Sequence, residues 1–448
     1  MILEFRVTNY RSYRDTAIFS MIPTREQKFR DRLAFVEKRY RKKVNPIAAV
    51  YGPNASGKSN LLRGIVDLQL LIQGDTTAWK EDLYFRLDAQ KKTEPVVFQV
   101  HFLHKEMIYV YGLSILAGKV VEEYLYQMTS VSETLLFERD ESSIELGKLL
   151  DDPTLGLIKD NIEPNETFAH RLGSTFRNKD EYSDFCAPYL FFKRVIAIGR
   201  GGTAIPHPLY RNEATFSLNK ALEALDTGLL RLDFIDAEFS SATVSEAEAA
   251  ELLESRDISE WLLVRNSRMY LIASDVGGKS LQQVRFIHQG FEGEFALEWQ
   301  DLSHGTQKII SILPWLWIVM NAKEPPVLLI DELDLGLHTS LVASLIDAFL
   351  ARCTPQSRGQ LLFTAHDLLL MDLEYLRRDE IWICEKGSKG ASELIRLTDY
   401  KGIRADLDIR KSYLEGRFGG MPQIFKSQLC DALDVSGSLG VESAKEKA

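Results

Sequence analysis

Four residues of the types that hold a phosphate group lie within one short segment. Gly52 and Gly57, followed directly by Lys58 and Ser59, complete the spacing G-x-x-x-x-G-K-[ST]. In such a turn, successive backbone N–H groups point inward and surround an anion at the start of a helix. Lys58 would place its charge on the β- and γ-phosphates, and the Ser59 hydroxyl would be a ligand of Mg²⁺. The predicted nucleotide-binding residues here are Gly52, Asn54, Ala55, Ser56, Gly57, Lys58, Ser59 and Asn60.

A second group of reactive side chains lies far downstream, at the ends of two apolar runs. Asp331 follows residues 327–330 and could hold the Mg²⁺ shell, while Glu332 could orient or deprotonate an attacking water. His366 ends the run 360–366 and could sense the γ-phosphate, but a lone histidine at a strand end also fits a structural role. Together with the phosphate-binding turn, these residues predict a protein that binds a nucleoside triphosphate with Mg²⁺ and hydrolyses it.

A parallel sheet is the element that could bring these side chains together. Residues 47–51 form an apolar strand that ends at the phosphate-binding turn, and the helix after it runs to about residue 74. Residues 327–330 and 360–366 predict buried parallel strands because they are almost continuously apolar. The two distant halves of the chain are therefore expected to fold back on each other and to share one triphosphate.

The remaining sequence suggests lobes around this α/β core. The regions we predict are an N-terminal ATPase lobe (1–140), a mainly helical insertion (141–260), a C-terminal ATPase lobe (261–426) and a poorly ordered tail (427–448). An antiparallel β layer is expected in the first lobe, where residues 96–102 and 108–113 alternate between apolar and polar. Residues 245–256 are rich in Ala and Glu, which indicates an exposed helix in the insertion.

Composition places the chain among ordinary folded proteins of the cytoplasm. Of its 448 residues, 45% are hydrophobic and 26% charged, and four cysteines match no zinc or redox spacing. The N-terminus lacks the layout of a signal peptide. The longest apolar run, residues 309–320, is interrupted by Pro314 and is too short to cross a bilayer. We therefore expect no membrane contact and a reducing cytoplasmic location.

Charge is unevenly distributed along the chain. The net charge is −10, but residues 25–43 contain nine basic and three acidic residues. Such a segment could hold the phosphates of DNA or RNA. It could equally be a solvated loop or a face for an acidic partner protein, and the sequence leaves these alternatives open.

Ser303 lies in a short segment, residues 302–307, directly before an apolar helix. A serine at this position can cap the first turn of the helix. It can also present its hydroxyl to an anion at the same helix end. The two roles are compatible.

The ordered motifs of the chain resemble those of ABC-type ATPases of the RecF, SMC and OLD group. The matching segments are residues 9–12, the phosphate-binding turn, residues 302–307, Asp331-Glu332 and His366. The resemblance implies an ABC-type P-loop ATPase head with an antiparallel β layer and an inserted, mainly helical arm.

In that group, the serine-glycine signature of one subunit closes over ATP held by another. Ser303 and Gly305 would play this part, and the resemblance implies a head-to-tail homodimer or higher oligomer. Arg11 resembles an arginine that contacts the nucleotide, and His338 would lie near the loop that crosses between sites. Gln90 and Gln99 are both candidates for the glutamine loop. His304 departs from the glycine that is common in the signature.

A closer resemblance is to short ATPases of bacterial anti-phage defence of the AbiL/RloA type. It is carried by residues 84–88, 135–139, 225–228 and 413–419, and it extends to about Pro422. ATPases of this type usually act with a separately encoded effector, often a nuclease.

Three functions fit these observations. The leading hypothesis is an ATP-hydrolysing sensor or scaffold that controls a partner effector in anti-phage defence. The alternative is a RecF/SMC-like ATPase that clamps DNA in repair or maintenance. A self-contained nuclease is the third, but little chain follows His366. Asp406 and Asp408, which could pair on a metal, lie in a segment that matches the C-terminus of the ATPase family itself.

Overall fold

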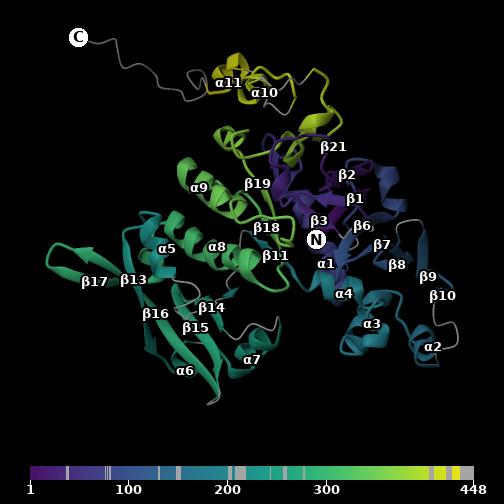
Figure 1. The fold of residues 1–448 in the computed structure, drawn as a ribbon, viewed down its shortest axis with the longest axis horizontal. Coiled ribbons are helices and arrows are strands. Elements are labelled where there is room, and N and C mark those ends of the chain that lie inside the picture. Colours follow the sequence, from purple (N-terminus) through teal and green to yellow (C-terminus); the bar gives the residue numbers. More distant parts are fainter. Residues whose placement is uncertain are drawn as a thin grey trace, which may run out of the picture.

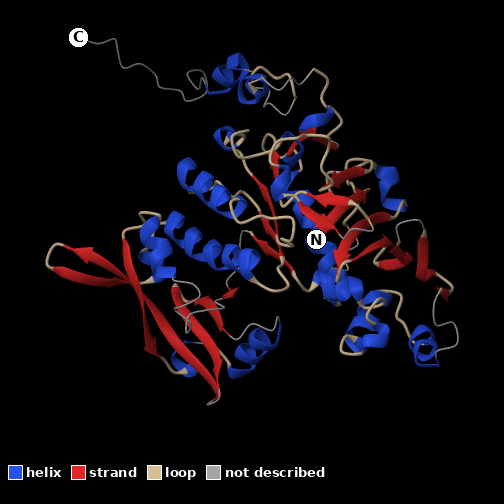
Figure 2. Cartoon of the chain, viewed as in Figure 1, coloured by secondary structure: helices blue, strands red, loops and turns tan. Residues whose placement is uncertain are grey.

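The computed structural model describes residues 1–433 apart from 37–39, 76, 78, 80–81, 130–131, 148–152, 200–203, 207–217, 243, 256–259, 276–277, 403–407 and 420–425. Three sheets dominate it, and helices lie between and beside them (Figures 1 and 2). Within the described ranges, no helix is both long enough and apolar enough to cross a membrane.

A six-stranded sheet forms the centre of the molecule. Its strands, in spatial order, are β11 (Val195–Ile198), β18 (Val327–Ile330), β19 (Gln360–Thr364), β5 (Ile47–Tyr51), β20 (Ile381–Lys386) and β21 (Ser392–Arg396). All neighbours are parallel except β20 and β21. Strands β5, β18 and β19 are buried throughout, which their continuous apolar runs predict. The expected α/β core is confirmed, and β5, β18 and β19 end at one edge of it.

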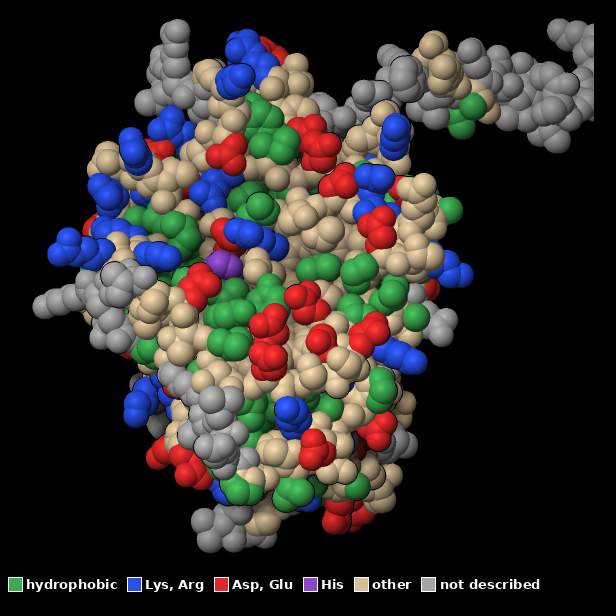
Figure 3. Space-filling model, turned by 90° about the vertical axis from the view of Figure 1, so that its right-hand side faces the viewer, with side chains coloured by type: hydrophobic (Ala, Val, Ile, Leu, Met, Phe, Trp, Pro, Cys, Tyr) green, Lys and Arg blue, Asp and Glu red, His purple; other side chains and the backbone are tan. Residues whose placement is uncertain are grey.

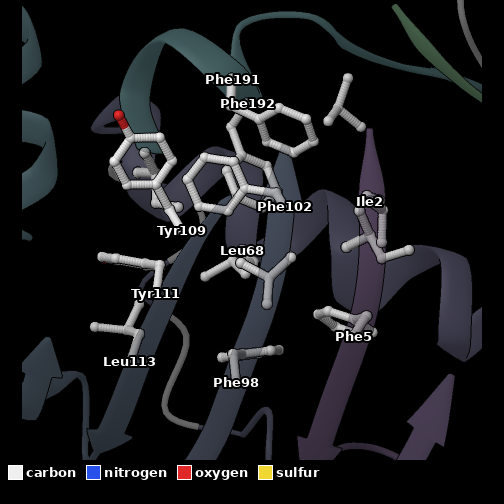
Figure 4. Packing of buried hydrophobic residues seen from close by; sticks show 14 of the residues in the cluster. Ile2, Phe5, Leu68, Phe98, Phe102, Tyr109, Tyr111, Leu113, Phe191 and Phe192 are labelled. Atoms are coloured by element: carbon white, nitrogen blue, oxygen red, sulfur yellow. The ribbon is translucent and has the colours of Figure 1, made fainter. Parts of the chain in front are cut away.

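A seven-stranded antiparallel sheet packs against this core through helix α1 (Lys58–Gln73). Its strands, in order, are β10 (Ile144–Leu146), β9 (Glu133–Asp140), β8 (Lys119–Met128), β7 (Met107–Leu116), β6 (Val96–His104), β1 (Ile2–Thr8) and β2 (Ala17–Ser20). Figure 4 shows Leu68 of α1 among Phe98, Phe102 and Tyr111 of the sheet, with Phe191 of α4 (Ala187–Phe192) beside them. The expected antiparallel β layer is therefore present, and its core holds α1 in place.

Helices make up most of the regular structure described in the stretch 141–260, but the stretch also contributes strands to sheets outside it. Its helices are α2 (Pro153–Asp160), α3 (Phe168–Phe176), α4, α5 (Leu218–Ala224), α6 (Phe239–Ala242) and α7 (Glu246–Ser255). It also contributes strand β11 to the core sheet and strand β13 (Leu229–Asp236) to a third sheet. The partners of these strands lie between 46 and 132 residues away in sequence, so local composition does not reveal them.

The third sheet continues past the predicted boundary at residue 260. Its strands are β12 (Ala204–Pro206), β14 (Glu260–Arg265), β15 (Arg268–Asp275), β16 (Gly278–Gly290) and β13, and β17 (Gly293–Leu297) pairs with β16. One face packs on helix α8 (His304–Asn321), with Leu271 and Phe286 in the same core as Ile309. The other face packs on α6 and α7. This sheet therefore supports the helix that begins at the signature segment.

The other elements complete the edges of the molecule. They are the hairpin β3 (Ala34–Val36) and β4 (Lys42–Val44), helices α9 (Thr339–Leu350), α10 (Ile409–Leu414) and α11 (Lys426–Leu433), and short 3-10 helices at 30–32, 89–93, 180–182, 299–301, 368–370, 378–380 and 397–399. Helix α11 occupies the start of the predicted poorly ordered tail, and residues 434–448 lie outside the described part. Asp408 caps α10 by accepting the N–H of Lys411, whereas Asp406 lies outside the described residues.

Several basic residues of the segment 25–43 are used inside the fold. The Arg32 side chain is buried and forms an ion pair with buried Glu380, and Lys28 Nζ donates to the C=O of Leu373. Arg41 and Lys42 are exposed, and Lys38 and Arg39 lie outside the described residues. Figure 3 shows one face on which Lys and Arg gather toward the upper left and acidic side chains across the middle. Part of the basic segment thus attaches the N-terminal region to the C-terminal lobe.

His104 gives the fold a dependence on pH. Its Nδ1 lies 2.8 Å from Arg194 Nη2 and must accept that hydrogen bond, and burial together with the charge of Arg194 lowers the pKa of His104 from 6.5 to about 3. The folded state favours the neutral ring. The contribution of His104 to the free energy of unfolding is therefore complete above pH 6.5 and is lost as pH falls toward 3. Between pH 7 and pH 5 this group should remove about 2 kcal/mol from the free energy of unfolding.

The variant His104→Gln isolates this contribution. The glutamine amide oxygen can accept from Arg194 but does not titrate. We expect denaturant unfolding of this variant to change less between pH 7 and pH 5 than that of the wild type. Equal pH dependence of the two proteins would contradict the assignment.

Candidate active site

The phosphate-binding turn joins β5 to α1 in the conformation that its sequence predicts. A Cβ at Gly52 would lie 2.2 Å from the C=O oxygen of Cys384, and one at Gly57 would lie 2.3 Å from Ser392 Oγ. Gly57 also has a φ of 113°, and Ala55 at the exposed tip has a φ of 61°. Only glycine fits the two close approaches. The turn therefore brings its backbone N–H groups to the start of α1, where Asn54 is exposed.

Lys58 is folded onto this turn. Its Nζ donates to the C=O groups of Gly52 at 2.8 Å and Pro53 at 3.0 Å, and burial lowers the pKa of Lys58. Ser56 Oγ is buried and has no hydrogen-bond partner among the described residues. Within the part of the chain that the structure describes, this buried cation is held by carbonyl groups beside an unsatisfied hydroxyl, which fits a site for an anion.

The two halves of the chain meet at Ser59 and Asp331. Ser59 lies on α1 and Asp331 at the end of β18, and 272 positions separate them in the sequence. Ser59 Oγ nevertheless donates a hydrogen bond of 2.9 Å to Asp331 Oδ1. A hydroxyl and a carboxylate are the oxygen ligands that Mg²⁺ prefers. A cavity of about 370 Å³ opens beside them. Its lining residues are Ser59, Leu62, Arg63, Val66, Ala197, Ile198, Gly199, Leu329, Asp331 and Glu332.

Glu332 is held in an uncommon backbone conformation. Its φ is 52°, in the left-handed region that costs a residue with a side chain about 1–3 kcal/mol. Its N–H donates to Thr364 Oγ1 at 2.7 Å, and its C=O accepts from Lys308 Nζ. Lys308 also donates to the C=O of Leu335 at 2.9 Å. The strained residue is thus fixed from two sides, which is typical of a functional position.

Thr364 and Lys308 are site residues that the motifs do not identify. Thr364 is fully buried on β19, and its Oγ1 donates to Asp331 Oδ1 at 2.6 Å. Lys308 lies on α8, one turn after the helix begins. A polar residue at the end of a buried strand was the available signal for Thr364, but its partner depends on the order of the strands.

His366 lies directly beyond β19, between the ends of β18 and β5. Its side chain is exposed, and its backbone N–H donates to Asp334 Oδ2 at 2.8 Å. The N–H of Asp367 donates to the same oxygen at 2.7 Å. Asp334 therefore fixes the turn that carries His366, next to the edge where Lys58 and Asp331 lie.

Arg11 is directed away from the phosphate-binding turn. Its Nη2 lies 3.0 Å from Asp67 Oδ2, and its Nε donates to the Tyr10 hydroxyl at 2.8 Å. Asp67 is two turns further along α1 than Ser59. The neighbouring Ser12 is the residue of this motif that reaches the turn: its Oγ accepts from Asn60 Nδ2 at 2.8 Å.

The signature segment begins α8 with an exposed serine. Ser303 Oγ accepts the N–H of Thr306 at 3.1 Å, so the predicted helix cap is present. A Cβ at Gly305 would lie 2.6 Å from the C=O oxygen of Gly336, which brings this segment against the one that follows Asp331 and Glu332. His338 is exposed and caps α9 through Nδ1. The exposed hydroxyl of Ser303 also lies 2.9 Å from Thr306 Oγ1, so its contacts lie within its own helix.

Neither glutamine candidate reaches the cavity. Gln99 lies on β6 and donates to the Tyr124 hydroxyl at 2.7 Å, and Gln90 is exposed in the 3-10 helix at 89–93. The segment that enters the cavity beside β18 is the end of β11, with Ile198 and Gly199.

Comparisons with known proteins address the family of the chain. A family model described as "AAA domain, putative AbiEii toxin, Type IV TA system" matches residues 47–372, which include the phosphate-binding turn, residues 302–307, Asp331, Glu332 and His366 but not residues 9–12 or 413–419. Among solved structures, an SMC head domain from Thermotoga maritima is similar over 88% of this chain and 98% of that chain, with 12% identity and a TM-score of 0.34. A comparison with curated proteins gave no match. Because the family model covers most of the sequence, the chain belongs to the AAA-domain family of the AbiEii-toxin type.

Proposed function

We propose that this protein is a Mg²⁺-dependent ATPase that acts as a sensor or scaffold. The observation that carries the proposal is the contact between Ser59 Oγ and Asp331 Oδ1 at 2.9 Å, which joins the phosphate-binding turn to the acidic strand end. Lys58 would leave its carbonyl partners and bind the β- and γ-phosphates. Ser59 and Asp331 would hold Mg²⁺, which neutralises phosphate charge when bound. Glu332 would orient or deprotonate the attacking water.

A head-to-tail dimer is the assembly that we propose. Large apolar side chains are exposed around the edge where the site lies: Leu335 is 56% exposed and Leu369 is 59% exposed. They flank the segments that carry Glu332 and His366. Ser303 is exposed as well and has its capping contact within its own helix. A second copy of the chain could cover these groups and place its signature serine over the triphosphate.

Mixing two inactive variants tests this dimer. Lys58→Met removes the phosphate contact, whereas Ser303→Asp keeps a helix cap but places a negative charge against the partner's triphosphate. Each variant alone should hydrolyse little ATP. An equal mixture should recover up to about a quarter of the wild-type rate, because half of the dimers then contain one intact site of two. Ser303→Asn, which caps the helix without a charge, is the matched control.

No recovery in the mixture would contradict the head-to-tail arrangement, provided that both variants fold and exchange subunits. Phosphate release measures the rate, and size-exclusion chromatography with ATP measures the assembly. Full activity of Ser303→Asp alone would likewise remove the serine from the composite site.

Control of a partner effector in anti-phage defence is the biological role that we propose. The family description names a toxin of a toxin–antitoxin system, which implies a second component. The test is to express the gene with its neighbouring genes in a bacterial host and to challenge the cells with phage. Protection that disappears in Lys58→Met supports the role. Protection that persists with this chain deleted would contradict it.

The DNA-clamping alternative receives less support from the structure. Arg32 and Lys28, which belong to the basic segment, are engaged with Glu380 and Leu373 inside the fold. DNA binding that falls steeply with salt, and that is lost on charge reversal of exposed Arg41 and Lys42, would favour the alternative.

A further inference from the structure

The hydroxyl of Thr364 lies at the centre of the candidate active site, although no motif includes it. Its Oγ1 donates to Asp331 Oδ1 at 2.6 Å and accepts the N–H of Glu332 at 2.7 Å. The C=O of Thr364 accepts the N–H of Leu333 at 2.9 Å, so β19 binds the chain on both sides of Glu332. Thr364 has 0% exposure, and water therefore has no access to take over these bonds.

Only a hydroxyl can make both side-chain bonds at this position. It has one proton to donate and lone pairs that accept, whereas the isosteric valine has neither. Without Thr364 Oγ1, the N–H of Glu332 would lose its acceptor, and Asp331 Oδ1 would lose a donor. Glu332 would also lose one of the contacts that hold its φ at 52°, a region that a non-glycine residue keeps only when its surroundings fix it.

The same bonds assign the two oxygens of Asp331. Oδ1 accepts from Thr364 Oγ1 of β19 and from Ser59 Oγ of α1, at 2.6 and 2.9 Å. Among the described residues, Oδ2 makes no hydrogen bond and is the oxygen left for a cation. One continuous series of hydrogen bonds thus runs from Ser59 through Asp331 and Thr364 to the main chain of Glu332.

We propose that Thr364 is a positioning residue that makes the metal-facing carboxylate of Asp331 and the catalytic carboxylate of Glu332 move as one unit. The inference rests on the proposed ATPase function. His366 follows Thr364 by two residues, so a displacement of the end of β19 would reach Glu332 through this hydroxyl. Thr364 is fully buried, and it acts through the two acids.

The test compares Thr364→Val with Thr364→Ser. For Thr364→Val we expect kcat to fall about 10- to 100-fold with little change in KM for ATP, because loss of the partners that orient metal and catalytic groups has effects of this size. Thr364→Ser keeps the hydroxyl and should stay close to wild type. A second readout needs no nucleotide: amide hydrogen exchange at Glu332 should accelerate in Thr364→Val and not in Thr364→Ser.

Thr167→Val is the matched control for a general loss of stability. Thr167 is also fully buried, and its hydroxyl caps α3 by accepting the N–H of His170, away from the acids. The variant Thr167→Val should lower the midpoint of denaturant unfolding without lowering kcat. If Thr364→Val does not fold, Thr364→Cys takes its place, because a thiol bonds only weakly and the same direction is expected.

Wild-type kcat and wild-type exchange at Glu332 in Thr364→Val would overturn the proposal. Equal loss of activity in Thr364→Val and Thr167→Val would overturn it too, because the effect would then be one of stability. If the wild type does not hydrolyse ATP, the proposed function fails, and the exchange of the Glu332 amide still decides whether Thr364 holds that residue.

Discussion

Replacing Glu332 with glutamine is expected to lower kcat about 10²- to 10⁴-fold, because loss of a positioned general base has effects of this size. ATP should still bind to the variant. Glutamine keeps the shape of the side chain but cannot take a proton from water. The backbone contacts of Glu332, to Thr364 Oγ1 and Lys308 Nζ, do not involve the carboxylate and should survive the change. The phosphate-binding turn is also left intact.

Because hydrolysis would stop with ATP in place, the Glu332→Gln protein should accumulate as a nucleotide-bound dimer. Single-turnover phosphate release measures the chemical step, and light scattering after size exclusion with Mg²⁺ and ATP measures the dimer. Glu292→Gln on the hairpin between β16 and β17 makes the same chemical change far from the site, and it should behave like the wild type. Unchanged turnover in Glu332→Gln would remove Glu332 from its catalytic role.

The core of the fold was predictable because its signals are local. The run that ends at Tyr51 and the run that ends at Ile330 are so uniformly apolar that only a buried parallel strand suits them. The order of motifs then required Ser59 and Asp331 to meet, and they do so at 2.9 Å. Local sequence therefore predicted which two halves of the chain meet at the candidate site.

The residues that the sequence did not reveal depend on which strands are neighbours. Thr364 looks like an ordinary strand residue until β19 is known to lie beside β18, where its hydroxyl meets Asp331 and Glu332. Lys308 looks like a helix residue until α8 is placed against the segment after Glu332.

Arg11 shows that a motif match does not by itself give the direction of a side chain. The resemblance implies that Arg11 contacts the nucleotide, and in this structure its guanidinium is bound to Asp67 and Tyr10. A motif fixes where the backbone of Arg11 lies, whereas the direction of a long, charged side chain follows the nearest opposite charge. Asp67 lies on α1, a helix that the same motif packs against. The spacing of the two residues in the sequence does not predict the contact between Arg11 and Asp67.

Replacing Lys58 with methionine is expected to weaken ATP binding about 10- to 150-fold, which corresponds to loss of about 1.5–3 kcal/mol from hydrogen bonds to a charged group. The Lys58 side chain is 5% exposed and its Nζ is held by the C=O groups of Gly52 and Pro53. Methionine has a similar length and fills the same space without the charge. The free protein should therefore keep its fold, and titration with a fluorescent ATP analogue in Mg²⁺ measures the loss.

Two further variants separate charge from shape in this measurement. Lys58→Arg keeps the charge, but the planar guanidinium is too large for the nearly closed space and should also weaken binding. Lys119→Met removes an exposed lysine at the start of β8, away from the turn, and should bind ATP like the wild type. If Lys58→Met bound ATP as tightly as Lys119→Met does, the phosphate would have to be held by the backbone N–H groups of the turn alone, and the assignment of Lys58 would be wrong.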